Sequence, residues 1–399
     1  MGDENLAIPL FVPVRNWRYR TGRGSDRMLP LTCSHVVSFQ RKCKSQVNVA
    51  SGRYRSRFCN ESPPRDGYPV QSTKVVSAGS MGCATLSSRS LPLMSKSNLQ
   101  MNLEYVVARS LLFIFGLLPL GMSLFLGSKM AGGAYYFSGR LRRTGQRNLE
   151  LAFPGLSQPE RRRLLHGCFE NMGRLLGIFS HFTNDPEGLK GLLDLIDHEG
   201  FERLEVARKD GRGIILFTGH VGAWELSSFA LSLFGHPLSF LVRRIDNPKI
   251  ERLIDERRAQ LGNRTIDKRS AAREMLQILQ GGGTLGILVD LNTLDREGIF
   301  VDFFGVPAST TFILAKLALR TGAAVLPVFA PWDPERGRFL LKIDEPLVIE
   351  RTGDDEEDVR RLTQLFTGVV EKFVRRYPDQ WLWIHRRWKT RPPGEPGIY

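Results

Sequence analysis

The sequence predicts an α/β fold in which helices flank a mostly parallel sheet. Three short apolar runs, 214–217, 284–289 and 323–329, support this prediction, and each begins directly after a glycine. Runs of this length without a charge are typical of strands that are buried on both faces. Segments with apolar residues at helical spacing lie between and around these runs. Such alternation is the pattern of parallel strands joined by crossover helices.

The individual elements follow from spacing and from their end signals. We expect strands over 214–217, 238–242, 284–289, 323–329 and 339–343, the last at an edge of the sheet. We expect helices over 158–182, 226–234, 248–261, 270–280, 312–319 and 359–376. Glycines at 281–283 and at 322 end two of these helices, as glycine commonly does.

Composition divides the chain near residue 100. Residues 1–100 carry 15 Lys and Arg against 5 Asp and Glu, whereas the remaining residues carry 41 against 36. We expect no regular structure in this basic, Ser- and Gly-rich leader. Met94 and Met101 stand just ahead of the first patterned segment, so a start assigned too far upstream is an alternative explanation. Four of the five cysteines lie in the leader, and their spacing matches neither a zinc site nor a disulfide framework.

A 19-residue stretch without a charge, Ser110–Ser128, follows the leader. Its length is at the lower end of what spans a bilayer, so we expect a membrane anchor helix over 105–128 and a globular domain over 140–399. A buried core helix is the alternative. Four arginines between 140 and 147 place the globular domain in the cytoplasm by the positive-inside rule.

The stretch 213–225, GIILFTGHVGAWE, carries the first candidate site. His220 lies where a buried strand ends, and Glu225 lies where the next helix begins, which is where open α/β sheets place their chemistry. Gly219 and Gly222 allow the chain to turn so that the two side chains meet. A histidine held by a carboxylate is a general base that can activate a hydroxyl. A structural histidine near a helix start is the alternative.

Further polar groups follow two other predicted strands. Arg243 and Asn247 follow strand 238–242, and an arginine there is suited to phosphate or carboxylate. Arg257 and Arg258, on the next helix, fit a solvated surface. Asp290 ends strand 284–289 and is either a site residue or a capping aspartate.

Two longer segments are also candidates for a functional role. The connection 291–309 is long for a compact domain, and long loops are often functional. The segment 377–392 combines three tryptophans, His385 and four basic residues, which fits a membrane interface or a phosphosugar surface. A platform for single-stranded nucleic acid is the rival interpretation, and the expected membrane anchor argues against it.

Taken in order, these motifs resemble the bacterial lipid A biosynthesis acyltransferases, the late enzymes that add a secondary fatty acyl chain. The resemblance covers about residues 101–399. It rests on QRNLELAFPGLS at 146–157, GHVGAWE at 219–225, VRRIDNP at 242–248, FFGVPASTT at 303–311 and PDQWLWIHRRWKTRP at 378–392.

The resemblance implies a glycerolipid-acyltransferase-like fold and an enzyme of the bacterial inner membrane, single-pass or monotopic. The enzyme would move an acyl group from acyl carrier protein or acyl-CoA to a hydroxyl of a phosphorylated glucosamine lipid. It would need no metal, no bound cofactor and no nucleic acid. His220 would be the catalytic base and Glu225 its orienting partner. The implied substrate-binding residues are Arg243, Asn247, Asp290, Gly305, Thr310 and Thr311.

Two alternatives stay open at this point. A related group of enzymes acylates mannosylated phosphatidylinositol with the same HxxxxE chemistry. A catalytically silent membrane protein that binds lipid with this fold is the alternative outside the enzyme class. The sequence does not select the acyl chain length or the acceptor hydroxyl.

Overall fold

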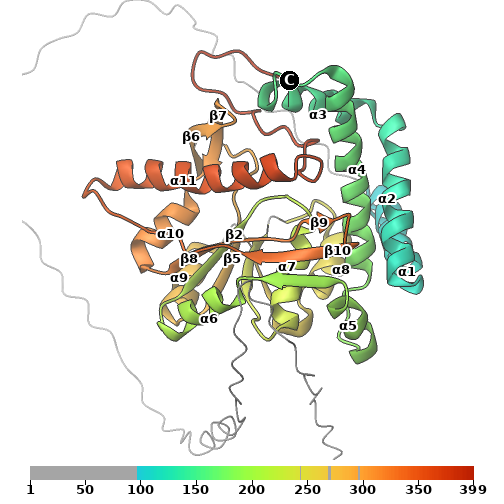
Figure 1. The fold of residues 1–399 in the computed structure, drawn as a ribbon, viewed down its shortest axis with the longest axis horizontal. Coiled ribbons are helices and arrows are strands. Elements are labelled where there is room, and N and C mark those ends of the chain that lie inside the picture. Colours follow the sequence, from blue (N-terminus) through green and yellow to red (C-terminus); the bar gives the residue numbers. More distant parts are fainter. Residues whose placement is uncertain (1–96, 243, 268–270, 295–296) are drawn as a thin grey trace, which may run out of the picture. The chain divides into compact units, whose positions relative to one another are not determined.

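The computed structural model describes residues 97–399, except 243, 268–270 and 295–296 (Figure 1). The prediction made for the leader over 1–100 therefore lies almost wholly outside the described residues, and so does the one made for Arg243. The described residues belong to one compact unit.

Within the described residues, a sheet of eight strands lies at the centre of this unit. Its order is β1-β10-β8-β2-β5-β3-β4, and β9 pairs with β10. β2 pairs in parallel with both β5 and β8, and β3 pairs in parallel with β5 and β4. The predicted mostly parallel sheet is confirmed. The strands are β1 (Ile196–Glu199), β2 (Ile214–Thr218), β3 (Ser239–Val242), β4 (Arg264–Asp267), β5 (Thr284–Leu288), β8 (Ala324–Phe329), β9 (Trp332–Asp333) and β10 (Arg338–Ile343).

The predicted edge position of strand 339–343 is wrong. β10 lies between β8, to which it is antiparallel, and β1, to which it is parallel. β1 has the sequence IDHE, and only Ile196 of its four residues is buried. A strand so short and polar carries no alternating apolar pattern, so the sequence did not reveal it.

Helices cover both faces of the sheet (Figure 1). On one face, Ile215 and Phe217 of β2 belong to a core cluster with α11, and on the other face Leu216 belongs to a cluster with α7. The helices are α3 (Gly139–Ala152), α4 (Gln158–Ser180), α5 (Pro186–Leu193), α6 (Phe201–Lys209), α7 (Trp224–Leu233), α8 (Pro248–Arg258), α9 (Ala271–Gln280), α10 (Ile313–Thr321) and α11 (Asp355–Arg376), with a 3₁₀ turn at Gln260–Gly262.

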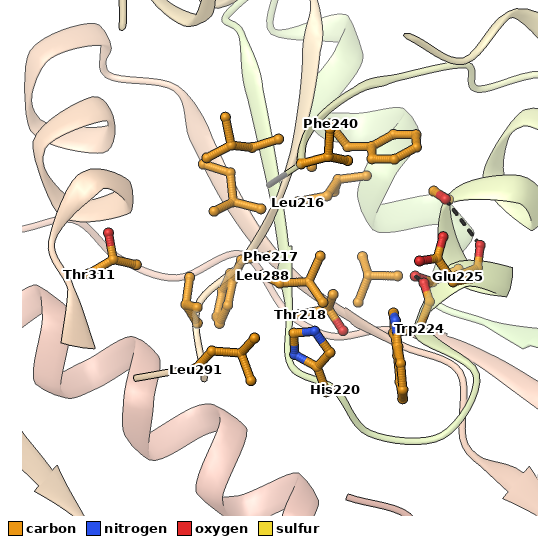
Figure 2. Close-up of a pocket in the computed structure, with 18 of the residues that line it drawn as sticks. Leu216, Phe217, Thr218, His220, Trp224, Glu225, Phe240, Leu288, Leu291 and Thr311 are labelled. Atoms are coloured by element: carbon orange, nitrogen blue, oxygen red, sulfur yellow. Dashed lines mark hydrogen bonds between the residues drawn. The ribbon is translucent and has the colours of Figure 1, made fainter. Parts of the chain in front are cut away.

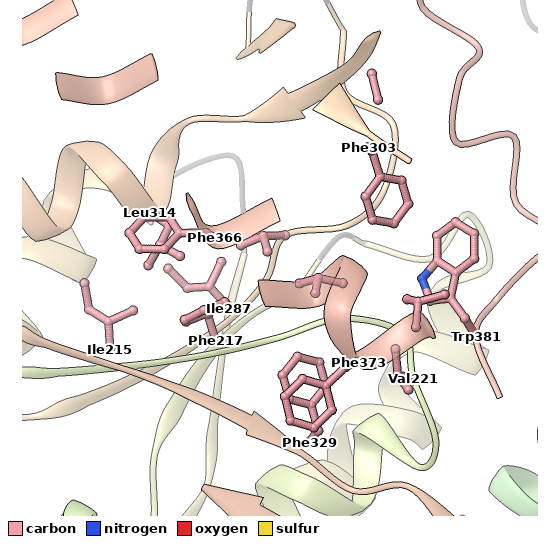
Figure 3. Close-up of a cluster of buried hydrophobic side chains, with 14 of the residues drawn as sticks. Ile215, Phe217, Val221, Ile287, Phe303, Leu314, Phe329, Phe366, Phe373 and Trp381 are labelled. Atoms are coloured by element: carbon pink, nitrogen blue, oxygen red, sulfur yellow. The ribbon is translucent and has the colours of Figure 1, made fainter. Parts of the chain in front are cut away.

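The spacing of the apolar residues along helix α11 places its buried side chains against the sheet. Asp354 caps its first turn by accepting hydrogen bonds from the backbone of Glu356 and Glu357. The buried residues Phe366 and Phe373 then face the sheet. Phe366 contacts Phe217 of β2, and Phe373 stacks on Phe329 of β8 with ring centroids 3.8 Å apart (Figure 3).

The apolar stretch Ser110–Ser128 does not form the single helix expected over 105–128. It is divided between α1 (Asn98–Leu117) and α2 (Leu120–Phe137). Pro119 lies at the break, where it lacks the backbone N–H that would continue α1. α2 packs closely on α4, because Gly127 and Gly173 have no side chains at the crossing. In the part of the chain that the structure describes, no helix is both long and apolar enough to cross a membrane.

The segment 291–309, expected as a long loop, contains part of a β-hairpin instead. β6 (Gly298–Phe303) pairs antiparallel with β7 (Val306–Thr311). Phe304 and Gly305 form the two-residue turn, and both have positive φ, of 57° and 73°. That is the pattern of the turns that fit a hairpin's twist. The hairpin lies against α11 (Figure 1).

Candidate active site

His220 lies just beyond β2, in a tight turn that two glycines make possible. A side chain on Gly219 would come within 2.7 Å of Val370 and 3.0 Å of Asp290. Gly222 has φ +66°, and a Cβ there would lie 2.3 Å from the carbonyl oxygen of Ala330. The turn therefore holds the His220 backbone close to the neighbouring strand ends, and α7 begins two residues after Gly222.

The carboxylate that holds His220 belongs to Asp290. β2 and β5 pair in register up to Thr218 and Leu288, so the residues after both strands lie side by side. His220 Nδ1 lies 2.7 Å from Asp290 Oδ1, and the His220 backbone N–H donates to Asp290 Oδ2 at 2.7 Å. Trp381 Nε1 donates to the same oxygen at 2.7 Å. Three hydrogen bonds thus fix this buried carboxylate.

These contacts keep Asp290 ionised. Burial by itself would raise the pKa of Asp290, but the attraction of His220 and the hydrogen bonds from His220 and Trp381 lower it from 3.8 to about 2. An ionised carboxylate can only accept hydrogen bonds, so His220 Nδ1 carries the proton of the shared bond. Nε2 has no hydrogen-bond partner among the described residues, and His220 lines a cavity.

Glu225, expected as the partner of His220, binds Arg258 instead. Arg258 Nε and an Nη atom donate to the two Glu225 carboxylate oxygens at 2.9 and 2.5 Å. Both side chains are only 16% exposed. The expected direct contact of the His220 ring with Glu225 is not formed, because α8 supplies a cation for Glu225 while β5 supplies the carboxylate for His220. Glu225 still lines the same cavity as His220.

This cavity has a volume of about 370 Å³ and lies between the sheet and α7. Figure 2 shows His220 and Trp224 at one end and Leu216 and Phe240 toward the other. The Trp224 ring lies beside His220, with ring centroids 4.9 Å apart. Most of the lining is aliphatic or aromatic, and Glu225 with Arg258 forms a polar part of the wall. The arrangement can hold an apolar chain while a histidine acts on a polar group at one end.

The structure places the other predicted substrate-binding residues at different distances from this cavity. Thr311 lines it. Thr310 is buried and accepts a hydrogen bond from Arg387 Nη at 2.5 Å. Gly305 makes the hairpin turn and is absent from the cavity lining.

Asn247 is the N-cap of α8 and also lies outside the cavity lining. Its Nδ2 donates to Met101 O and Glu104, and its Oδ1 accepts from Lys249 N and Ile250 N. These four bonds use the full capacity of the amide. A structural role explains Asn247 in this structure.

The sequence reasoning did not identify Trp381 and Arg387 as parts of the site. The tryptophans of 377–392, expected at a membrane or sugar surface, are fully buried at 381, 383 and 388. Arg387 is fully buried too, and it donates to Ser309 O at 2.7 Å. Burial lowers the pKa of Arg387 to about 10, against the attraction of Asp290. The dense run of tryptophan and arginine was the signal, but its composition alone did not separate a core role from a surface role.

Both arginines that were expected on a solvated surface are partly buried and have partners. Arg258, which lines the cavity, binds Glu225, and Arg257, outside the cavity lining, donates to Ser180 O at 2.9 Å. His385 lines the cavity, and its Nε2 accepts a hydrogen bond from Asn292 N at 3.2 Å. Among the described residues, no group of three or more His, Cys, Asp or Glu side chains is arranged to hold a metal ion.

A family model and individual known proteins match this chain, and their descriptions agree with one another. The family model described as bacterial lipid A biosynthesis acyltransferase matches residues 95–390. The lipid A biosynthesis lauroyltransferase of Escherichia coli (strain K12) is 29% identical over 283 residues, which cover 71% of this chain and 90% of the relative. The palmitoleoyltransferase of the same organism is 28% identical over 295 residues, which cover 72% of this chain and 92% of that relative. The myristoyltransferase of this organism is 25% identical over 264 residues, which cover 65% of this chain and 80% of that relative.

Proposed function

Because this chain belongs to the bacterial lipid A biosynthesis acyltransferase family and is an acyltransferase, we propose that it transfers a fatty acyl chain to a hydroxyl of a lipid A precursor. The observation that carries the proposal is the histidine His220, held by a buried carboxylate at one end of a largely apolar cavity. The acyl donor is a thioester of acyl carrier protein or of coenzyme A. No metal or bound cofactor takes part.

The reaction follows from the protonation of His220. Asp290 holds the proton on Nδ1, so Nε2 has a free lone pair. Nε2 takes the proton of the acceptor hydroxyl as its oxygen attacks the thioester carbonyl carbon. The carbon–sulfur bond then breaks, and the leaving thiolate takes the proton from Nε2. Asp290 stabilises the imidazolium that forms between these steps.

Direct transfer fits the site better than a covalent serine intermediate. Two serines line the cavity, but the hydroxyl of Ser227 donates to Trp224 O at 2.6 Å and that of Ser228 donates to Glu225 O at 3.1 Å. In the part of the chain that the structure describes, neither hydroxyl is hydrogen-bonded to His220, as a serine nucleophile would need to be. We therefore assign His220 to the acceptor hydroxyl.

Glu225 has a positioning role in this proposal. Its ion pair with Arg258 neutralises two charges that line the cavity beside His220. The pair also ties the first turn of α7 to α8, and thereby fixes the position of Trp224 against the His220 ring. Arg243 keeps its proposed role toward the phosphate of the acceptor, and it lies outside the described residues.

The proposed location is the cytoplasmic side of the bacterial inner membrane, with α1 and α2 as the contact surface. These helices expose large apolar side chains, and α3, which follows them, is basic. An apolar face beside basic residues binds the interface of an anionic bilayer. The exposed apolar residues are Leu99, Leu103, Val106, Val107, Phe113, Ile114, Leu117, Met122, Phe125, Leu126, Met130, Tyr136 and Phe137.

Mass spectrometry of lipid A and an assay with purified protein test the function together. We expect lipid A from a deletion strain to lack one secondary acyl chain, and His220→Ala to reduce transfer by about 10²- to 10⁴-fold. His198→Ala is the matched control, because His198 is exposed and outside the cavity lining. Unchanged lipid A, together with no transfer by the wild type to lipid A precursors or mannosylated phosphatidylinositol, would favour a silent lipid-binding protein.

A further inference from the structure

The apolar end of the His220 cavity contains one position without a side chain. Gly286 of β5 pairs with Leu216 of β2 on one side and with Phe240 of β3 on the other, and all three line the cavity. Residues paired in register across a sheet face the same side of it. Leu216 and Phe240 therefore flank a position in the cavity wall that has no side chain of its own.

Gly286 lies deep in the cavity as measured from His220. Leu288 of β5 pairs with Thr218, which precedes His220 by two residues. Gly286 is two residues further back along β5, so it lies roughly 7 Å further from His220 at the usual rise of a strand. Leu231 of α7 and Leu238, just before β3, line the same cavity.

A Cβ atom at position 286 would meet occupied space. It would lie 2.9 Å from Leu238 Cδ1 and 3.1 Å from Phe240 Cβ. The Leu238 atom is the end of a side chain and can shift, whereas Phe240 Cβ is attached directly to the β3 backbone. An alanine fits only if Leu238 moves, and the added methyl group narrows this end of the cavity. A larger side chain would displace Leu238 further and occupy more of this end of the cavity.

We propose that the missing side chain at Gly286 sets the depth of the cavity and thereby the longest acyl chain that the enzyme transfers. The inference rests on the proposed function, because it places the thioester carbonyl at His220 and the chain terminus toward Gly286. Leu216, Leu231 and Phe240 offer only hydrocarbon surface there, which suits an acyl terminus. Each carbon added to the side chain at 286 removes room from the end of the bound chain.

The test compares acyl donors of increasing length with full-length protein and a lipid A precursor that lacks its secondary chain. The donors are decanoyl, lauroyl, myristoyl and palmitoyl thioesters. For Gly286→Ala we expect the rate ratio of the longest to the shortest accepted donor to fall about tenfold, and further for Gly286→Val, since one methylene in an apolar pocket has an effect of that order. Leu285→Val is the matched control, because Leu285 is buried in the same strand outside the cavity lining.

Two further variants make the test independent of how well the Gly286 variants fold. Adding Leu238→Ala to Gly286→Ala removes the close contact and restores part of the preference for long donors. Phe240→Ala alone enlarges the cavity and shifts the preference to longer donors. An unchanged donor profile in Phe240→Ala and in folded Gly286 variants overturns the inference. A wild type that transfers no acyl chain overturns the proposed function instead, so the two failures are distinct.

Discussion

Replacing Asp290 with asparagine tests the proposed mechanism most directly. Asp290 Oδ2 accepts from two N–H groups, those of His220 N and Trp381 Nε1, and Oδ1 faces His220 Nδ1. The asparagine oxygen can keep the first two bonds, which leaves the Nδ2 group against His220 Nδ1. Since Nδ2 is a donor, His220 must turn its lone pair to it and carry the proton on Nε2. In that form Nε2 cannot accept the proton of the hydroxyl.

The expected loss in kcat is on the order of 10⁴-fold, as when a serine-protease triad loses its carboxylate in the same way. The three hydrogen bonds are retained but the carboxylate charge is lost, so the free energy of unfolding near neutral pH should fall by about 2 kcal/mol. Asp302→Asn on the exposed part of β6 is the matched control. If Asp290→Asn keeps more than about a tenth of the activity, the tautomer of His220 is not set by Asp290 and the argument fails.

Asp290→Asn should also change how the free energy of unfolding depends on pH in acid. Folding lowers the pKa of Asp290 from 3.8 to about 2. A carboxyl whose pKa is lowered on folding stabilises the protein above its unfolded pKa and loses that contribution as pH falls through the folded pKa. The wild type should therefore lose about 2 kcal/mol from Asp290 between about pH 4 and pH 2, and Asp290→Asn should lack this part of the pH dependence. Urea unfolding at a series of pH values measures the difference.

Two other predictions concern the Glu225–Arg258 pair and the exposed apolar helices. Glu225→Ala should destabilise the protein by about 3 kcal/mol because it leaves Arg258 buried without its main partner, and adding Arg258→Ala should recover part of that loss in urea unfolding. Arg244→Ala, in a pair whose arginine is 58% exposed, should change stability by less than about 1 kcal/mol; equal effects of the two single variants would contradict the argument. Replacing Phe113, Ile114 and Phe125 together with serine should abolish sedimentation with vesicles that contain anionic lipid, whereas Val348→Ser should not. Retained binding would remove α1 and α2 as the membrane contact surface.

The position of the candidate site could be predicted from sequence because the signals are local. An uncharged run after a glycine indicates a buried strand, and His220 follows such a run in a turn whose glycines have no room for side chains. Asp290 follows a second run of the same kind. Both residues were therefore identified as candidates, since only the few residues around each of them had to be interpreted.

The partners within the site could not be predicted in the same way. Glu225 lies five residues from His220, and that closeness in sequence suggested contact. The order of strands in the sheet decided otherwise, because the pairing of β2 with β5 brings Asp290 to His220 across 70 residues of chain. A carboxylate binds the charge or donor nearest to it in space, and α8 had placed Arg258 beside Glu225.

Burial was the other property that only the tertiary structure decided. The tryptophans and arginines of 377–392 have a composition suited to an interface, yet Trp381 and Arg387 are fully enclosed around Asp290. A single helix was expected over 105–128, and neither its division at Pro119 nor the close crossing of α2 on α4 was predicted. The sequence by itself determined the strands β2, β3, β5, β8 and β10, the turn at His220 and the family resemblance, which depend on neighbouring residues. The tertiary structure determined which carboxylate holds His220, because that depends on how distant segments pack.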